Sequence, residues 1–216
     1  LVFWLPGAVR QHTLSVVPAI KRQEIGEALL TRVERVSGRA CRSAEAAPVL
    51  AKLARRTGVR RLVVLPGGVR DSLHLPGGIV VLNRALIEDY EDPAVVAGYI
   101  LAEGLRARRD DPLGVLLRHA GTLAAFRLLT TGGLTKANLD SYAERVVVAE
   151  KPEVPPETLL AGFAAATVPS TPYAYARDIT GESVLALIEA DPMAGQTPAP
   201  VLRDRDWVVL QAICGG

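Results

Sequence analysis

The chain has 216 residues, of which 49% are hydrophobic and 22% charged, a composition that supplies a hydrophobic core and excludes an intrinsically disordered protein. Its formal net charge is only +2, and its short basic stretches, 55–61 and 106–109, contain no aromatic residue. A nucleic-acid partner is therefore not expected, because such proteins usually carry a concentrated basic face with aromatics between the charges.

An apolar stretch, Leu-Val-Phe-Trp-Leu-Pro-Gly, occupies residues 1–7. No apolar run reaches the roughly 18 residues that a membrane-spanning helix needs. Two interpretations of residues 1–16 stay open. They are either the remnant of a signal peptide or membrane anchor, whose removed part would have associated the protein with a membrane, or a packed N-terminal strand or arm. Residues 1–216 are expected to form a single domain.

The two cysteines, Cys41 and Cys214, lie far apart and have no metal-binding spacing. In an oxidising compartment they could close one long loop and tie the C-terminus to the N-terminal third, whereas in the cytosol they would be unrelated thiols. We favour the disulfide. Together with the apolar start, it predicts a protein that is periplasmic, or membrane-anchored and facing the periplasm.

Hydrophobic periodicity predicts helices at 17–36 and 44–56, each ending before a glycine. Two β-branched runs follow, at 61–65 and 79–82, and Leu-Pro-Gly-Gly occurs twice between their starts. Apolar runs that flank glycine-rich turns predict a hairpin or a pair of neighbouring strands.

The rest of the chain is predicted to be mainly helical, because Asp-Pro pairs at 92–93 and 111–112 supply two helix starts. The predicted helices are 93–109, 112–129, 136–150, 156–166 and 182–189, with a loop at 169–175 and a final strand at 207–213. The expected fold class is therefore α+β, a mainly helical domain with a small β-sheet.

The most informative stretch is 71–87, Asp-Ser-Leu-His-Leu-Pro-Gly-Gly-Ile-Val-Val-Leu-Asn-Arg-Ala-Leu-Ile. It is similar to the signature of the HtpX/CAAX-prenyl-protease family of zinc metalloendopeptidases, in which a Leu-Pro-Gly-Gly turn leads into an apolar strand, a short helix and then a helix with the motif HExxH. Counting without a gap places that motif on 102–106, Ala-Glu-Gly-Leu-Arg. The resemblance covers roughly residues 41–109 and implies a metallopeptidase-like domain.

The HExxH chemistry needs two histidines four residues apart to bind zinc and a glutamate to polarise the zinc-bound water. By the resemblance, Glu103 stands at the catalytic base, Ala102 at the first histidine and Arg106 at the second. Alanine has no donor atom, and a guanidinium ion repels a metal. We therefore expect a catalytically inactive protein without a cofactor, although zinc is the family's metal. We also expect a buried ion pair between Glu103 and Arg106.

The resemblance further implies that the strand after Leu-Pro-Gly-Gly lies near the cleft and binds a polypeptide by β-augmentation. The residues expected to do so are Gly77, Gly78, Ile79, Val80 and Val81.

Two other hypotheses remain. One is an active zinc endopeptidase with ligands drawn from His74, His119 and Glu103. The later helix, where the family has its third ligand, offers Glu144 and Glu150, but neither lies in a convincing copy of the family's motif and neither is assigned as a ligand. The other is a purely structural, envelope-associated domain whose cleft has filled in.

Overall fold

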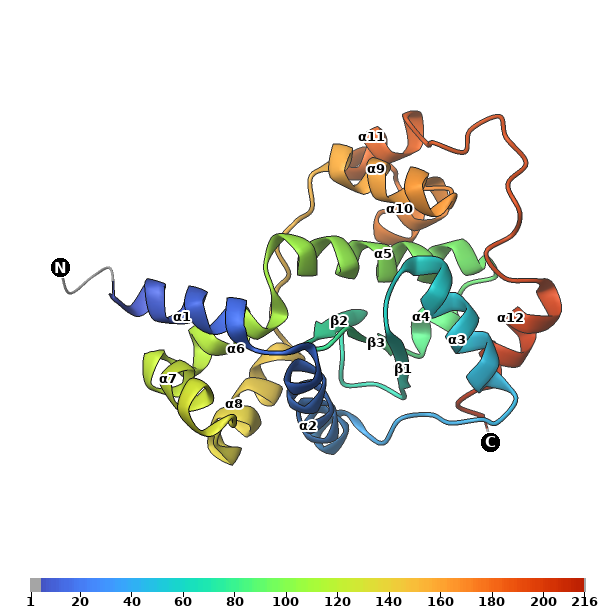
Figure 1. Cartoon of the computed structure of the whole chain (residues 1–216). Helices are drawn as coiled ribbons and strands as arrows, with labels where there is room; N and C mark the ends of the chain where they lie inside the picture. The colour runs from blue at the N-terminus through green and yellow to red at the C-terminus, as the bar shows by residue number, and fades with distance from the viewer. Residues whose placement is uncertain (1–4, 216) are drawn as a thin grey trace.

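A computed structural model describes residues 5–215 (Figure 1). The protein is mixed α+β, 60% helical with a small three-stranded sheet, as the sequence predicts. The elements are α1 (Leu5–Val16), α2 (Ala19–Ser37), α3 (Ala46–Thr57), β1 (Arg61–Leu65), β2 (Ser72–Leu75), β3 (Ile79–Asn83), α4 (Ala85–Glu88), α5 (Pro93–Arg109), α6 (Pro112–Ala120), α7 (Thr122–Thr131), α8 (Lys136–Val146), α9 (Pro156–Ala166), α10 (Thr171–Arg177), the 3-10 turn η1 (Glu182–Val184), α11 (Leu185–Glu189) and α12 (Asp204–Gln211).

The sheet has the order β1-β3-β2, with β3 parallel to β1 and antiparallel to β2. The two predicted strands are therefore neighbours, but they run parallel and do not form a hairpin. The hairpin joins β2, which periodicity alone did not predict, to β3. Gly77 and Gly78 make its turn, each with a φ of +77°. The turn lies directly on α2, since a Cβ on Gly77 would be 2.6 Å from Gln23 Cα.

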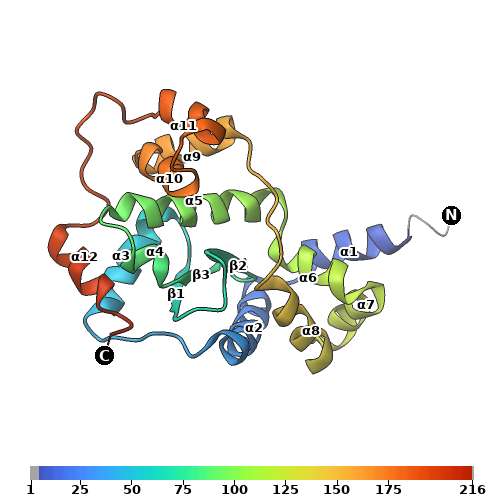
Figure 2. The ribbon, with the colours of Figure 1, turned by 180° about the vertical axis from the view of Figure 1, so that it is seen from behind.

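Helices cover both faces of the sheet, as Figures 1 and 2 show. Side chains alternate between the two faces along each strand. On β3, Val80 and Leu82 belong to a core that includes α3, α5 and α12, whereas Ile79 and Val81 pack with α2, α6 and α8. Because both faces of β3 are buried, its successive residues are apolar and do not alternate with polar ones.

Helix α5 lies across one face of the sheet and carries the residues aligned with HExxH. It begins as predicted, because the Asp92 side chain accepts a hydrogen bond from the Ala94 amide (2.7 Å) and Pro93 occupies the first turn. Its far side contacts α9 and α10. At Gly98 the approach is so close that a Cβ would lie 2.5 Å from the Tyr173 Cβ. Helix α5 is thus fixed on two sides.

The predicted final strand at 207–213 is wrong, because this segment belongs to α12. The β-branched run Trp-Val-Val-Leu favours a strand by propensity. Its burial has a helical period instead: Trp207, Leu210 and Ile213 are buried, whereas Val208 is 63% exposed. Packing against α3 decides the outcome.

Other segments also differ from the prediction. The predicted loop at 169–175 holds most of α10, the predicted helix at 136–150 ends at Val146, and the predicted helix at 112–129 is two helices, α6 and α7. They meet at Gly121, whose φ of +88° does not fit a continuous α-helix.

Residues 1–4, which hold most of the apolar start, lie outside the described residues, while the rest of the 1–16 segment forms α1 and contacts α6 and α7. Within residues 5–215, no helix is both long enough and apolar enough to cross a membrane.

A disulfide joins Cys41 to Cys214, with their Cα atoms 4.9 Å apart. The Cys41 amide also donates a hydrogen bond to the Val64 carbonyl of β1 (2.9 Å). The disulfide therefore ties the C-terminal end of the chain to β1, an edge strand of the sheet.

Replacing both cysteines by serine should lower the free energy of unfolding by about 4–5 kcal/mol, because the disulfide closes a loop that spans most of the chain. Guanidinium unfolding of Cys41→Ser/Cys214→Ser against the oxidised wild type measures the loss. Cys41→Ser alone should show nearly the same loss, since either change breaks the bond. A loss below about 1 kcal/mol would show that the disulfide does not constrain the unfolded chain.

Candidate functional site

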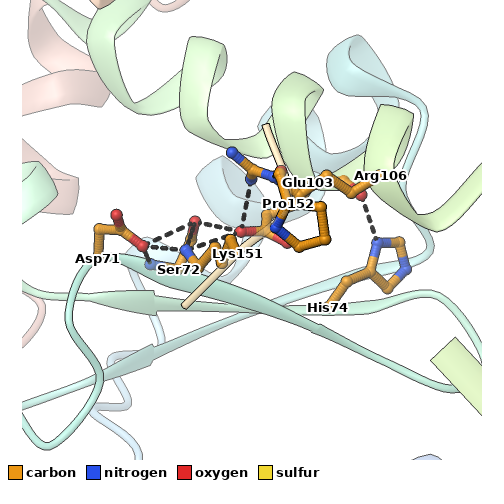
Figure 3. Close-up of polar contacts among 7 residues, drawn as sticks. All are labelled: Asp71, Ser72, His74, Glu103, Arg106, Lys151 and Pro152. Carbon is orange, nitrogen blue, oxygen red and sulfur yellow. Dashed lines mark hydrogen bonds and ion pairs between the residues drawn. The ribbon is translucent and has the colours of Figure 1, made fainter. Parts of the chain in front are cut away.

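A cluster of charged and polar side chains lies between β2, α5 and the segment that follows α8 (Figure 3). Its members are Asp71, Ser72, His74, Glu103, Arg106 and Lys151.

The carboxylate of Glu103 is the centre of this cluster and is almost fully buried, with the residue 3% exposed. Its Oε1 accepts hydrogen bonds from Ser72 Oγ (2.8 Å) and Arg106 Nη1 (3.1 Å), and it forms an ion pair with Lys151 Nζ (2.9 Å). A buried carboxylate is costly unless it is paired and hydrogen-bonded. Here the Arg106 and Lys151 cations and the Ser72 hydroxyl supply the charge pairing and the hydrogen bonds.

Local geometry explains how these groups meet. Glu103 and Arg106 are three residues apart on α5 and therefore share a face of the helix. Ser72 and His74 project from β2 toward α5, because their neighbours Leu73 and Leu75 point into the opposite core.

Lys151 arrives from a distant part of the sequence. Besides Glu103, its ammonium group pairs with the Asp71 carboxylate and lies 3.2 Å from Ser72 Oγ. The Arg106 guanidinium also donates from Nε to the Pro152 carbonyl (3.0 Å). The segment around Lys151 is thus bound to both β2 and α5.

The proximity of Ser72 and Lys151 does not make a catalytic serine–lysine pair. Ser72 is completely buried, and its hydroxyl donates to Glu103. Lys151 acts as a cation that bridges two carboxylates. A nucleophilic serine needs access to a substrate and a neighbouring base, and this arrangement supplies neither. The cluster is an ion-pair network.

The residues at the HExxH positions do not fit zinc. Ala102 is fully buried in the core, without a donor atom. The positive groups of Arg106 and Lys151 lie 3.1 and 2.9 Å from Glu103 Oε1, where they would repel a metal ion. The expected pair of Glu103 with Arg106 is present, and Lys151 adds a second cation to it.

The alternative zinc ligands are not gathered into one site. His74 donates from Nδ1 to the Glu103 carbonyl (3.2 Å), whereas His119 Nε2 is hydrogen-bonded to Ser141 Oγ (3.0 Å). Glu144 and Glu150 are exposed. Among residues 5–215, no three His, Cys, Asp or Glu side chains are grouped so that they could hold a metal ion.

The expected peptide-binding strand must also be corrected. Ile79, Val80 and Val81 are fully buried in β3, the central strand, whose two edges pair with β1 and β2. Gly77 and Gly78 form the turn before it. These residues offer no free edge to a polypeptide, because their backbone hydrogen bonds are already made within the sheet.

The outer strand on this side is β2. The Asp71 carbonyl accepts a hydrogen bond from the Asn83 amide (2.7 Å), so Leu73 and Leu75 occupy the next hydrogen-bonded positions opposite β3. The backbone groups of Ser72 and His74 therefore point away from the sheet, and the Ser72 amide donates to the Asp71 carboxylate.

A cavity of about 570 Å³ lies beside β2 and the cluster. Its walls are mainly apolar and include Leu73, Ala107, Val115, Tyr142 and Val146. Glu103, Arg106 and Lys151 line it as well. It can hold an apolar group next to polar backbone and charged side chains, a combination common in binding sites.

Comparisons add no relative to this picture. No protein-family model matches the chain, and a search of curated proteins finds no match either.

No sequence motif marks Lys151, Asp71 or Ser72 as a member of the site. A single lysine before a proline in a loop carries no motif, and Lys151 enters the cluster only through folding. Asp71 and Ser72 begin the stretch that carries the resemblance, but nothing in that stretch pairs them with a distant cation.

Glu103→Gln should lower the free energy of unfolding by about 3 kcal/mol, because it leaves two partly buried cations without their shared carboxylate. Glu144→Gln, which changes an exposed glutamate on α8, is the matched control and should cost less than about 0.5 kcal/mol. Chemical unfolding of both variants checks the difference. Equal losses would mean that the Glu103 network does not stabilise the fold.

The pKa of the His74 imidazole is lowered by burial, although the hydrogen bond to the Glu103 carbonyl and the Glu103 charge oppose the shift. The unfolded chain then binds a proton before the folded protein does, so stability falls as the pH drops below about 6.5. In His74→Asn, which keeps a donor near the position of Nδ1, the loss of stability between pH 7.5 and 5 should be smaller than in the wild type. Parallel profiles of unfolding free energy against pH would contradict this assignment.

Proposed function

We propose that this chain is a non-catalytic, metallopeptidase-like protein that binds an extended segment of a polypeptide in the cavity beside β2. The observation that carries the proposal is the position of the cavity, which combines apolar walls with the outer strand of a sheet. Apolar walls suit side chains, and the outward backbone groups of His74, which lines the cavity, suit a peptide backbone.

The absence of catalysis is part of the proposal and rests on the charges around Glu103. The resemblance to HtpX/CAAX-prenyl-protease enzymes assigns the catalytic base to this residue. Its carboxylate is instead bound by Arg106, Lys151 and Ser72, so it is not free to polarise a water molecule. The open cavity supports a binding role over that of a purely structural domain, in which the cleft would be filled.

The disulfide between Cys41 and Cys214 supports an oxidising compartment, for which we propose the periplasm. Membrane association through a removed N-terminal segment stays a prediction.

Ala107→Trp tests the binding site, because this residue lines the cavity and a large side chain there would fill it. Peptides selected from a random library on the wild-type protein should bind the variant about tenfold more weakly or worse, a loss of 1.4 kcal/mol or more. Ala161→Trp adds the same side chain at an exposed position on α9, outside the cavity, and should bind normally. Titration calorimetry gives the affinities, and thermal melting verifies that both variants are folded.

Two results would contradict the proposal. One is unchanged peptide affinity in Ala107→Trp. The other is hydrolysis of the selected peptides by the wild-type protein in the presence of added zinc, which would show that the site is catalytic.

A further inference from the structure

Residues 149–155, here called the strap, connect α8 to α9 without regular secondary structure. Figures 1 and 2 show the strap passing the C-terminal end of α5 on its way between these helices. It also forms part of the wall of the cavity beside β2.

Val154 of the strap packs into the core at 6% exposure, and Lys151 is the side-chain contact of the strap with the charged cluster. Its ammonium group lies among three oxygen atoms, those of the Asp71 carboxylate, Ser72 Oγ (3.2 Å) and Glu103 Oε1 (2.9 Å). An ammonium ion has three N–H donors, so one lysine matches this pocket in both charge and hydrogen bonding. We call these three acceptors the ammonium pocket.

The main chain of the strap is held through its carbonyl groups. Arg106 donates to the Pro152 carbonyl (3.0 Å), and Arg109 donates to the Glu153 carbonyl (3.3 Å). The side chain of Glu153 pairs with Arg177 (3.0 Å). These partners are side chains of α5 and α10, so the strap is bound much as a separate peptide would be.

Within the described residues, the strap makes no backbone hydrogen bond with the outer edge of β2, although the Lys151 side chain contacts Ser72. In the described part of the chain, the strap amides of Lys151, Glu153 and Val154 donate no hydrogen bond. No strand ladder joins the strap to β2 either. A free peptide could therefore make the same contacts with the ammonium pocket and add backbone hydrogen bonds that the strap lacks.

We propose that the strap is an internal pseudo-ligand, and that the polypeptide partner carries a lysine whose ammonium group replaces that of Lys151 in the ammonium pocket. This inference rests on the proposed function and specifies both the chemistry of the partner and the regulation of the site. The partner binds in an extended form and displaces the strap. Lysine fits better than arginine, because the pocket surrounds one compact cation and not a planar fork.

Competition from the strap lowers the apparent affinity of the partner, since only the fraction of molecules with a displaced strap can bind. Lys151→Met removes the competing ammonium group but keeps an unbranched side chain of similar length. It therefore raises the fraction of competent molecules and leaves the ammonium pocket empty. Glu103 retains Arg106 and Ser72 as partners in this variant.

The probe is an acetylated and amidated peptide with the sequence of residues 148–155, Val-Ala-Glu-Lys-Pro-Glu-Val-Pro. A second peptide has norleucine in place of its lysine. The lysine peptide should bind Lys151→Met about tenfold or more tightly than it binds the wild type, and the norleucine peptide should lose about tenfold or more on the same variant. Lys136→Met, at an exposed lysine of α8, is the control and should match the wild type.

Equal affinity of the two peptides for Lys151→Met would overturn the ammonium pocket as a binding site. Equal affinity of the lysine peptide for the wild type and Lys151→Met would overturn the strap as its occupant. Binding of other, lysine-free peptides that Ala107→Trp abolishes would leave the proposed function intact while this inference fails.

A measurement on the wild-type protein covers the case in which Lys151→Met does not fold. Reductive dimethylation, followed by mass spectrometry, should modify Lys151 much more slowly than the exposed Lys136. Saturating lysine peptide should raise the rate at Lys151 by roughly threefold or more, because displacement exposes its amine. No increase would overturn the inference.

Discussion

The buried carboxylate of Glu103 constrains the arrangement of everything around it. A carboxylate that is almost removed from water needs both charge neutralisation and hydrogen bonds, and those partners come from three separate parts of the chain. Ser72 fixes β2 against α5, Arg106 lies on α5 itself, and Lys151 fixes the segment between α8 and α9. The strap, the helix and the outer strand therefore all meet at this one charged group.

Arg106 and Lys151, the two cations paired with Glu103, come from different parts of the chain. Arg106 lies one turn away on the same helix, so its pairing requires no other element to be in place. Lys151 belongs to an irregular segment, and the proposed exchange requires its contact to be lost without unfolding α5. Arg106 and Ser72 would still compensate the carboxylate if the strap moved. In the proposed exchange, Arg106 is the partner that stays and Lys151 is the partner that is replaced, and both line the cavity.

Local signals in the sequence predicted much of the fold and part of the site. The Asp92–Pro93 start predicted α5, and the three-residue spacing of Glu103 and Arg106 predicted their contact. Strand order was not predictable in the same way, because two apolar runs can pair in either direction. The error placed the peptide edge on β3, which is central, when the outer strand is β2. Lys151 was missed since its role depends on a contact between residues distant in sequence.

The unpaired edge of β2 distinguishes a binding site from a filled cleft. Buried backbone groups nearly always find partners, and an outer strand is usually paired, covered or blocked by charges. Here a lysine side chain covers Ser72, but the strap makes no ladder with β2 and an apolar cavity remains beside it. A domain whose cleft had become structural would gain stability by packing side chains into that space and by pairing the strand. The retained cavity and the unpaired strand both favour a site that another polypeptide can occupy.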